Sequence, residues 1–400
     1  MKSLRLLMVV PVAVLLALST VPDPAVAQST APSSRILKIP SGALGETRLV
    51  HVHLPEGYAI ARQRYPVVVL LDGQVRAFND ITLASVAYDL TGEQHPIAMR
   101  PHIVVAVEQG DRADDLVRRQ DAFLRFLTDE LLPRIDKDYR TVPFRTLIGH
   151  SLGGRFALGA LCRAPRDFPA VIAISPSLTD SLASAVVRCV REDSASTHRF
   201  LAVSAGTREP RALANVERLV AVLRDSIPPH WHIARIDAPG LDHTGAPLIT
   251  IPMGLRFIFS DSAWQLPAAI DDSLSRRLGD ADRLLARGIA ARDRAFGLPR
   301  GASLDAVATE YARVVRAWLW HRNGERAVAS ARQLVERHPD TMLSHTLLID
   351  ALDAAGDQAG ARKAIESALT WSNRVPWFDE TQKARFQTQM RQALTERIPR

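Results

Sequence analysis

The chain has 400 residues, a formal net charge of +7 and two cysteines. A chain of this length can form two domains. Its excess of basic residues is not gathered into a dense run of lysine and arginine among aromatic residues, so nucleic acid is excluded as a partner. The two cysteines have no recognisable ligand spacing, and we expect neither a metal nor a cofactor. Whether Cys162 and Cys189 form a disulfide cannot be read from their positions, and both states stay open.

The first 27 residues have the pattern of a secretory signal peptide. Lys2 and Arg5 precede an apolar run from Leu6 to Leu18, and Ala25-Val26-Ala27 supplies a small-residue cleavage site. The run is too short for a comfortable transmembrane helix. Cleavage after Ala27 predicts an exported protein, periplasmic or secreted, with no membrane span after cleavage.

From residue 28 to 264, apolar runs typical of strands alternate with stretches of helical periodicity. The predicted strands are 36–39, 48–54, 66–71, 102–107, 146–148, 170–174, 199–204 and 232–236, and the predicted helices include 78–90, 123–135, 156–161, 182–190, 213–223 and 252–259. This alternation predicts an α/β fold with a mostly parallel sheet, whose active site lies at the carboxyl ends of the strands. In the second strand, His51 and His53 alternate with apolar residues, so we expect them on the solvated face of an edge strand.

The motif Gly149-His150-Ser151-Leu152-Gly153-Gly154 lies between an apolar run and a helical stretch. It matches the Gly-x-Ser-x-Gly nucleophile elbow, in which a strand turns sharply into a helix with the serine at its apex. Glycines are needed there because side chains beside the serine would clash. We therefore predict Ser151 as the nucleophile and the Leu152 N–H as one oxyanion donor.

A serine nucleophile needs a histidine base, and the histidine needs a carboxylate. In this fold class the chain order is serine, acid, histidine. His243 follows the last predicted strand, so it lies at the correct edge of the sheet and is the predicted base. Glu209 is the first carboxylate after strand 199–204 and is the predicted acid, with Asp237 and Asp242 as rivals.

The second oxyanion donor is expected in the loop after strand 66–71. Gln74 is the candidate, and Gly73 is the alternative. Asp72, in the same loop, is expected to fix the loop rather than to take part in the chemistry. Three further side chains could offer charge to an anionic substrate, but we expect them to be solvated: Arg112, Arg118 and Arg119.

The segments that carry a wider resemblance occur in order: Leu70-Leu71-Asp72-Gly73, Glu130 to Asp136, Tyr139-Arg140-Thr141, the serine motif, Ala173-Ile174-Ser175-Pro176-Ser177-Leu178 and the histidine loop. Over roughly residues 35 to 260 the chain resembles the esterase family that includes esterase D, the enterochelin and salmochelin esterases and the mycolyltransferases. The resemblance implies an α/β-hydrolase fold, a triad of Ser151, Glu209 and His243, and Gln74 and Leu152 as oxyanion donors. Thr179-Asp180 stand where relatives often have aromatic residues, so substrate identity is not carried over.

From residue 271 to 400 strand signals vanish. Small residues at helical spacing, with Gly324 and Gly356 at turns, resemble about two degenerate tetratricopeptide (TPR) repeats. Such repeats bind peptides or mediate association, so a protein partner is one expectation. The alternative is a helical cap that packs on the first domain or covers its cleft.

The sequence therefore predicts a signal peptide at 1–27, an α/β-hydrolase esterase domain at 28–264 and an α-helical TPR-like region at 271–400. The predicted function is an exported serine hydrolase that cleaves carboxylic esters through an acyl-enzyme, with a small-molecule substrate such as a siderophore ester or another acyl ester. The alternatives are an acyltransferase and an interaction protein in which the hydrolase domain serves as a scaffold.

Overall fold

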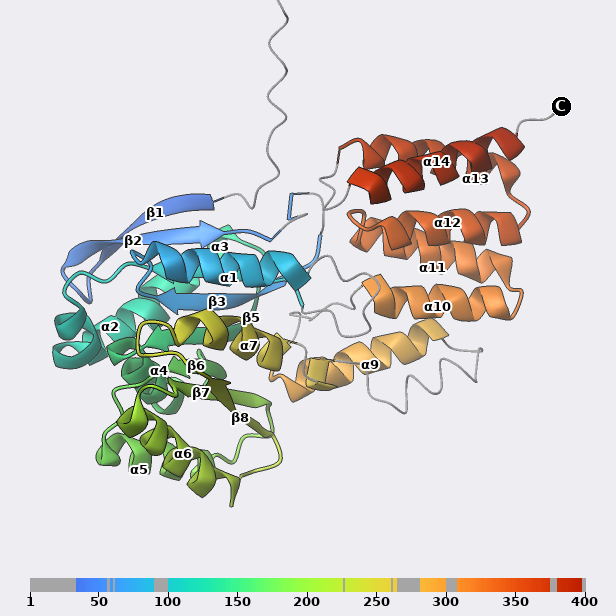
Figure 1. The fold of residues 1–400 in the computed structure, drawn as a ribbon. Helices are drawn as coiled ribbons and strands as arrows, with labels where there is room; N and C mark the ends of the chain where they lie inside the picture. The colour runs from blue at the N-terminus through green and yellow to red at the C-terminus, as the bar shows by residue number, and fades with distance from the viewer. Residues whose placement is uncertain are drawn as a thin grey trace, which may run out of the picture.

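The computed structural model describes residues 34–55, 58–59, 62–89, 100–225, 227–259, 262–264, 281–299, 308–374 and 380–397. The predicted signal peptide lies outside these ranges. An α/β region comes first along the chain, and a set of helices follows it (Figure 1). None of the described helices combines the length and apolar character needed to cross a bilayer.

The α/β region is built on one eight-stranded sheet in the order β1-β2-β4-β3-β5-β6-β7-β8. The pairs β1–β2 and β2–β4 are antiparallel, and every later neighbouring pair is parallel. This confirms the predicted mostly parallel sheet. The strands are β1 (Ser34–Ser41), β2 (Glu46–His53), β3 (Tyr65–Leu71), β4 (Ile103–Val107), β5 (Thr141–His150), β6 (Ala170–Ile174), β7 (Arg199–Gly206) and β8 (Trp231–Ala238).

The prediction for the two histidines of β2 was wrong. β2 lies between β1 and β4, so β1 is the edge strand. His53 is buried, and the His51 ring is hydrogen-bonded to Glu108 at 2.6 Å. Alternation of histidine with valine therefore occurs in a covered strand as well as in an edge strand, and the pattern alone does not identify an edge.

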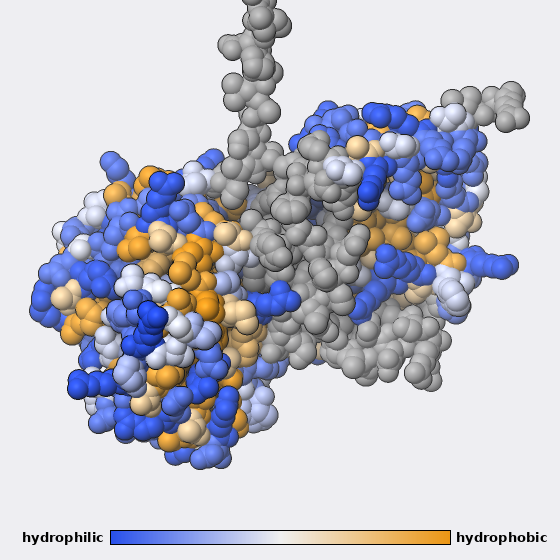
Figure 2. All heavy atoms as spheres, viewed as in Figure 1, coloured by the Kyte–Doolittle hydropathy of each residue, from blue (hydrophilic) through white to orange (hydrophobic). Residues whose placement is uncertain are grey.

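Helices cover both faces of the sheet, and β3 shows why. Val67, Val69 and Leu71 point into one core and Val68 and Leu70 into the other, because side chains alternate across a strand. The first core is covered by α4 (Leu152–Arg163), α5 (Asp180–Glu192) and α6 (Pro210–Arg224), and the second by α1 (Arg76–Asp89) and α7 (Pro247–Phe259). Figure 2 shows apolar side chains gathered on the α1 and α7 face, where Leu248 and Met253 are exposed.

The segment predicted as one amphipathic helix is divided. The predicted range 123–135 spans the end of α2 (Gln120–Arg125), η2 (Phe126–Leu131) and the start of α3 (Leu132–Asp138), and a further segment, η1 (Asp114–Arg118), precedes α2; η1 and η2 have π-helical geometry. Phe123, Phe126 and Leu127 are nevertheless fully buried, so the apolar spacing identified the packed face correctly. Hydrophobic periodicity does not distinguish an α-helix from one interrupted by π turns.

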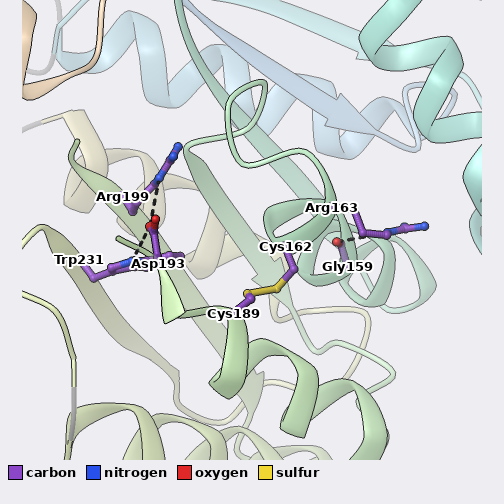
Figure 3. The surroundings of a disulfide bond; sticks show 7 residues. All are labelled: Gly159, Cys162, Arg163, Cys189, Asp193, Arg199 and Trp231. Atoms are coloured by element: carbon purple, nitrogen blue, oxygen red, sulfur yellow. Dashed lines mark hydrogen bonds and ion pairs between the residues drawn. A yellow bond between two sulfur atoms is a disulfide. The ribbon is translucent and has the colours of Figure 1, made fainter. Parts of the chain in front are cut away.

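A disulfide joins α4 to α5. Cys162 near the end of α4 is bonded to Cys189 on α5, with their Cα atoms 5.8 Å apart (Figure 3). Beyond α5, Asp193 accepts a hydrogen bond from the Trp231 indole at 3.0 Å and pairs with Arg199 at 3.5 Å. The question that the sequence left open is settled in favour of pairing.

The described part of the C-terminal region is helical and forms successive antiparallel pairs (Figure 1). Its helices are α9 (Ala281–Ala295), α10 (Ala308–Trp320), α11 (Gly324–Arg337), α12 (Met342–Ala354), α13 (Gln358–Ser372) and α14 (Glu380–Glu396). A Cβ at Gly324 would lie 2.7 Å from the Ala354 carbonyl oxygen, so glycine allows the two hairpins to meet there. The helical class is confirmed, whereas the TPR assignment stays a prediction.

The helical region joins the sheet at the edge where the parallel strands begin, which we call the amino edge. Phe296 lies just after α9, and its ring centroid is 4.2 Å from that of Trp264, at a tilt, and 5.3 Å from that of Phe144 near the start of β5, edge-on. His198, before β7, donates its N–H to the Ala295 carbonyl at 2.8 Å. These contacts lie opposite the carboxyl ends of the strands, where the predicted catalytic residues are found.

Candidate active site

Ser151 occupies the turn between β5 and α4. Its backbone has φ 59° and ψ −114°, a conformation that non-glycine residues rarely adopt. A Cβ at Gly149 would lie 2.2 Å from the Gly153 carbonyl oxygen, so the glycine is required by the sharpness of the turn. The strained conformation at this serine is what a nucleophile elbow demands.

The predicted acid and base are in contact. Glu209 Oε1 lies 2.6 Å from His243 Nδ1, although the two residues are 34 positions apart. Glu209 lies between the end of β7 and the start of α6, and His243 lies in the turn after β8. This bond places the proton on Nδ1 and leaves Nε2 as the basic nitrogen.

The second carboxylate oxygen of Glu209 is also held. Oε2 accepts from Ser175 Oγ at 2.6 Å and from the Gly206 N–H at 2.9 Å. Burial raises the pKa of Glu209, but the hydrogen bonds from Ser175, His243 and Gly206 outweigh it and lower the pKa below its ordinary value. Glu209 is therefore ionised wherever His243 can act as a base.

The rival carboxylates have other partners. Asp242 Oδ1 accepts from the N–H groups of Thr244 and Gly245, at 3.1 and 2.9 Å, and so caps the turn that carries the histidine. Asp237 pairs with Arg235 at 2.9 Å. The structure thus brings Glu209, and neither rival, to the imidazole.

His243 is close to the nucleophile through the residue before it. The rings of His243 and His150 are 4.5 Å apart, and His150 immediately precedes Ser151. The side chain of His243 is half exposed, with 49% of its surface accessible. The imidazole of His243 therefore borders the elbow through His150 and is open to solvent.

The two predicted oxyanion donors lie at the ends of neighbouring elements. Leu152 is the first residue of α4, so its N–H has no acceptor within the helix. Gln74 follows β3, and its side-chain oxygen accepts from the Gln109 N–H at 3.2 Å, which fixes the loop to the end of β4. The alternative donor, Gly73, already donates its N–H to the Val107 carbonyl at 2.8 Å.

Arg112 keeps 37% of its side chain exposed, but it is held by partners and is not simply solvated. Its guanidinium binds Asp72 through two bonds, of 2.5 and 2.9 Å, and Asp72 is 1% exposed. Arg112 also donates to the His150 carbonyl at 3.3 Å, so it links the loop after β3 to the elbow. Arg118 and Arg119 are partly exposed, as expected, and both pair with Asp114.

Sequence reasoning gave no role to Ser175 or His150, and it named Arg112 only as a possible charge for an anionic substrate. Ser175 lies in the Ser-Pro-Ser-Leu segment, which carried the family resemblance without a role for this serine. Its φ of 40° is the available structural signal that the position is constrained. Among the residues that the structure describes, no three His, Cys, Asp or Glu side chains are grouped as metal ligands.

Comparison with known proteins gives the family of the α/β region. The family model Esterase, described as "Putative esterase", matches residues 41–274. Among curated proteins, the ferri-bacillibactin esterase BesA of Bacillus subtilis is 44% identical over 59 residues, which are 14% of this chain and 20% of that protein. The matched segment is thus about a fifth of that relative.

Solved structures share the fold. An IroE-like serine hydrolase from Shewanella oneidensis superposes with a TM-score of 0.59 at 20% identity, covering 76% of this chain and 98% of the other. An uncharacterised protein from Capnocytophaga ochracea gives a TM-score of 0.57 at 16% identity and covers 91% of this chain and 99% of its own. These likenesses confirm the predicted α/β-hydrolase fold.

Proposed function

Because the chain belongs to the Esterase family, whose model matches more than half of it, we propose that it is an exported serine hydrolase of carboxylic esters. The observation that carries the proposal is the 2.6 Å contact between Glu209 and His243 beside the strained turn at Ser151. Three side chains far apart in the sequence gather at the carboxyl edge of the sheet, where α/β enzymes place their chemistry.

The proposed reaction begins with attack of Ser151 Oγ on the ester carbonyl carbon. His243 Nε2 accepts the hydroxyl proton, and Glu209 holds the imidazole through Nδ1. The N–H groups of Gln74 and Leu152 stabilise the oxyanion. The alcohol leaves with the proton from His243, and water, activated by the same nitrogen, hydrolyses the acyl-enzyme.

For the substrate we propose a small ester, with siderophore esters as the first class to test. A relative named as a ferri-bacillibactin esterase supports this class. A siderophore hydrolase from Aspergillus nidulans, EstB, has the same fold at a TM-score of 0.50 and 21% identity. The disulfide between Cys162 and Cys189 supports the proposed export, because disulfides persist in oxidising compartments.

The test is activity profiling of the mature chain, residues 28–400, on a panel of short acyl esters and of ferric and iron-free siderophore lactones. A fluorophosphonate probe should label the wild type and not Ser151→Ala, with circular dichroism showing that the variant is folded. Labelling that persists at another residue would contradict the assignment of Ser151. Absence of both hydrolysis and labelling in the wild type would defeat the proposed function.

A further inference from the structure

We propose that His150 is a positioning residue that holds the main chain of His243 against the nucleophile. This inference rests on the proposed function, because it assigns a task to His150 only if His243 is the base. The observation is a hydrogen bond of 2.8 Å between His150 Nε2 and the carbonyl oxygen of His243. A carbonyl only accepts hydrogen bonds, so His150 donates through Nε2–H.

The bond crosses the site from one catalytic element to another. His150 is the last residue of β5 and is covalently joined to Ser151, whereas His243 lies 93 positions further along the chain. A donor on the residue before the nucleophile thus fixes the backbone of the base. This bond is a direct link between the strand that carries the serine and the turn that carries the imidazole.

The bond from His150 falls at the middle of the turn that carries His243. Before the histidine, Leu241 is held because its carbonyl accepts from the Arg208 N–H at 3.0 Å. After it, the Asp242 side chain caps the N–H groups of Thr244 and Gly245. The Nδ1 bond to Glu209 orients the ring, and the bond from His150 adds a hold on the main chain that carries the ring.

His150 is itself well fixed. Its carbonyl accepts from Arg112, which is paired with buried Asp72. Its ring meets Phe78 of α1 edge-on, with the centroids 5.6 Å apart. Burial, followed by the nearby His243, lowers the pKa of His150, so it is a neutral donor in the range where an esterase works. A neutral ring also adds no positive charge beside the base.

The experiment compares His150→Leu and His150→Gln with the wild type in the mature full-length chain. Leucine removes the donor, whereas the glutamine amide nitrogen can reach the same carbonyl. We expect the leucine variant to lose about ten- to a hundredfold in kcat, because small misplacement of a catalytic group has effects of this size. Its KM should stay within about twofold, since the ester is bound by other groups. Glutamine should recover most of kcat.

The matched control is His345→Leu in the helical region. His345 Nε2 also bonds a backbone carbonyl, that of Pro339, at 3.0 Å, but at α12, far along the chain from the site. This variant should keep the wild-type kcat. His150→Met serves as a second non-donor variant should leucine prevent folding.

Hydrogen–deuterium exchange over residues 239–246 gives a readout that does not depend on activity. Exchange should be faster in the non-donor variants and close to wild type in His150→Gln. Wild-type kcat and exchange in the non-donor variants, or equal damage from glutamine and leucine, would overturn the inference. An inactive wild type would defeat the proposed function instead, while the exchange comparison would still decide whether His150 holds the turn.

Discussion

At the residue scale, the site is a chain of polar contacts in which each member orients the next. Ser175 and the Gly206 N–H hold one oxygen of Glu209, the other oxygen holds His243, and His243 borders the elbow. Such networks are preorganised, so that the protein need not rearrange its dipoles when charge develops on the imidazole. Loss of a member remote from the ester should therefore reduce the rate without altering substrate binding.

Ser175→Ala tests this reading. Ser175 is 2% exposed, and its hydroxyl donates to an ionised carboxylate, a bond worth roughly 1.5–3 kcal/mol. We expect kcat to fall by about tenfold or more while KM changes little. The lost hydrogen bond supports the charge that develops in the transition state and does not contact the bound ester. Ser184→Ala, at an exposed position on α5, is the matched control and should behave as wild type in the same steady-state assay.

The lowered pKa of Glu209 predicts a pH dependence of stability. The folded-state pKa lies below the ordinary value of 4.5, so the ionised carboxylate stabilises the fold above that value. The contribution is lost as the pH falls through the lower, folded-state pKa. We expect the free energy of unfolding of the wild type to exceed that of Glu209→Gln at neutral pH, and the gap to shrink at acid pH. Urea denaturation at a series of pH values measures the difference in the free energy of unfolding between the two proteins. A difference that does not change with pH would contradict the lowered pKa of Glu209.

At the element scale, the disulfide ties the helix that follows the nucleophile to the helix beside it. Cys162 and Cys189 close a loop with a sequence separation of 27. In the chain-entropy account, a loop of this size stabilises the fold by about 3–4 kcal/mol, chiefly by restricting the unfolded chain. The disulfide between α4 and α5 therefore adds to the stability of the fold as a whole.

Replacement of both cysteines by alanine should lower the free energy of unfolding by about 3 kcal/mol, measured by urea denaturation of the mature chain. The activity of the folded variant should be close to wild type, since the bond lies away from Glu209 and His243. Equal stability of the oxidised wild type and the double variant would show that the disulfide does not constrain the unfolded state. Dithiothreitol treatment of the wild type gives an independent check.

The sequence predicted most of the elements because hydrophobic runs and periodicity report burial directly. Every predicted strand is present, and Ser151 lies between a strand and a helix as its motif predicted. What escaped prediction was pairing between distant polar groups. Arg112 reads as a surface residue until the fold brings it to buried Asp72, and nothing local links Ser175 to Glu209. A pattern reports that a side chain is polar but not which partner it meets.

At the scale of the whole molecule, the helical region and the candidate site are at opposite edges of the sheet. Phe296 and Trp264 meet the sheet near the starts of β5 and β7, whereas Ser151 and Glu209 follow the ends of the same strands. The expectation that the helices cover the cleft is therefore not supported by these contacts. Arg292, fully buried and paired with Glu310 at 2.7 Å, ties α9 and α10 together beside this junction.

Phe296→Ala tests whether the two regions share one core. The ring is 5% exposed among Phe144, Phe200 and Trp264, and truncation of a buried phenylalanine costs about 3–5 kcal/mol. We expect the temperature of thermal inactivation of the esterase to fall, because the lost ring belongs to the core between the sheet and helices α1 and α7. Well below that temperature kcat should be unchanged, since the junction is at the amino edge.

The matched control for this junction is Phe386→Ala, in which the same side chain is removed from the core between α13 and α14. Phe386 is 3% exposed, so the local cost should be similar, but its neighbours belong to the helical region. If the two regions unfold separately, this variant loses helical signal before activity, whereas Phe296→Ala loses both together. Thermal scans that follow circular dichroism and residual activity in parallel distinguish these outcomes. Unchanged inactivation in Phe296→Ala would show that the catalytic region folds without support from the helices.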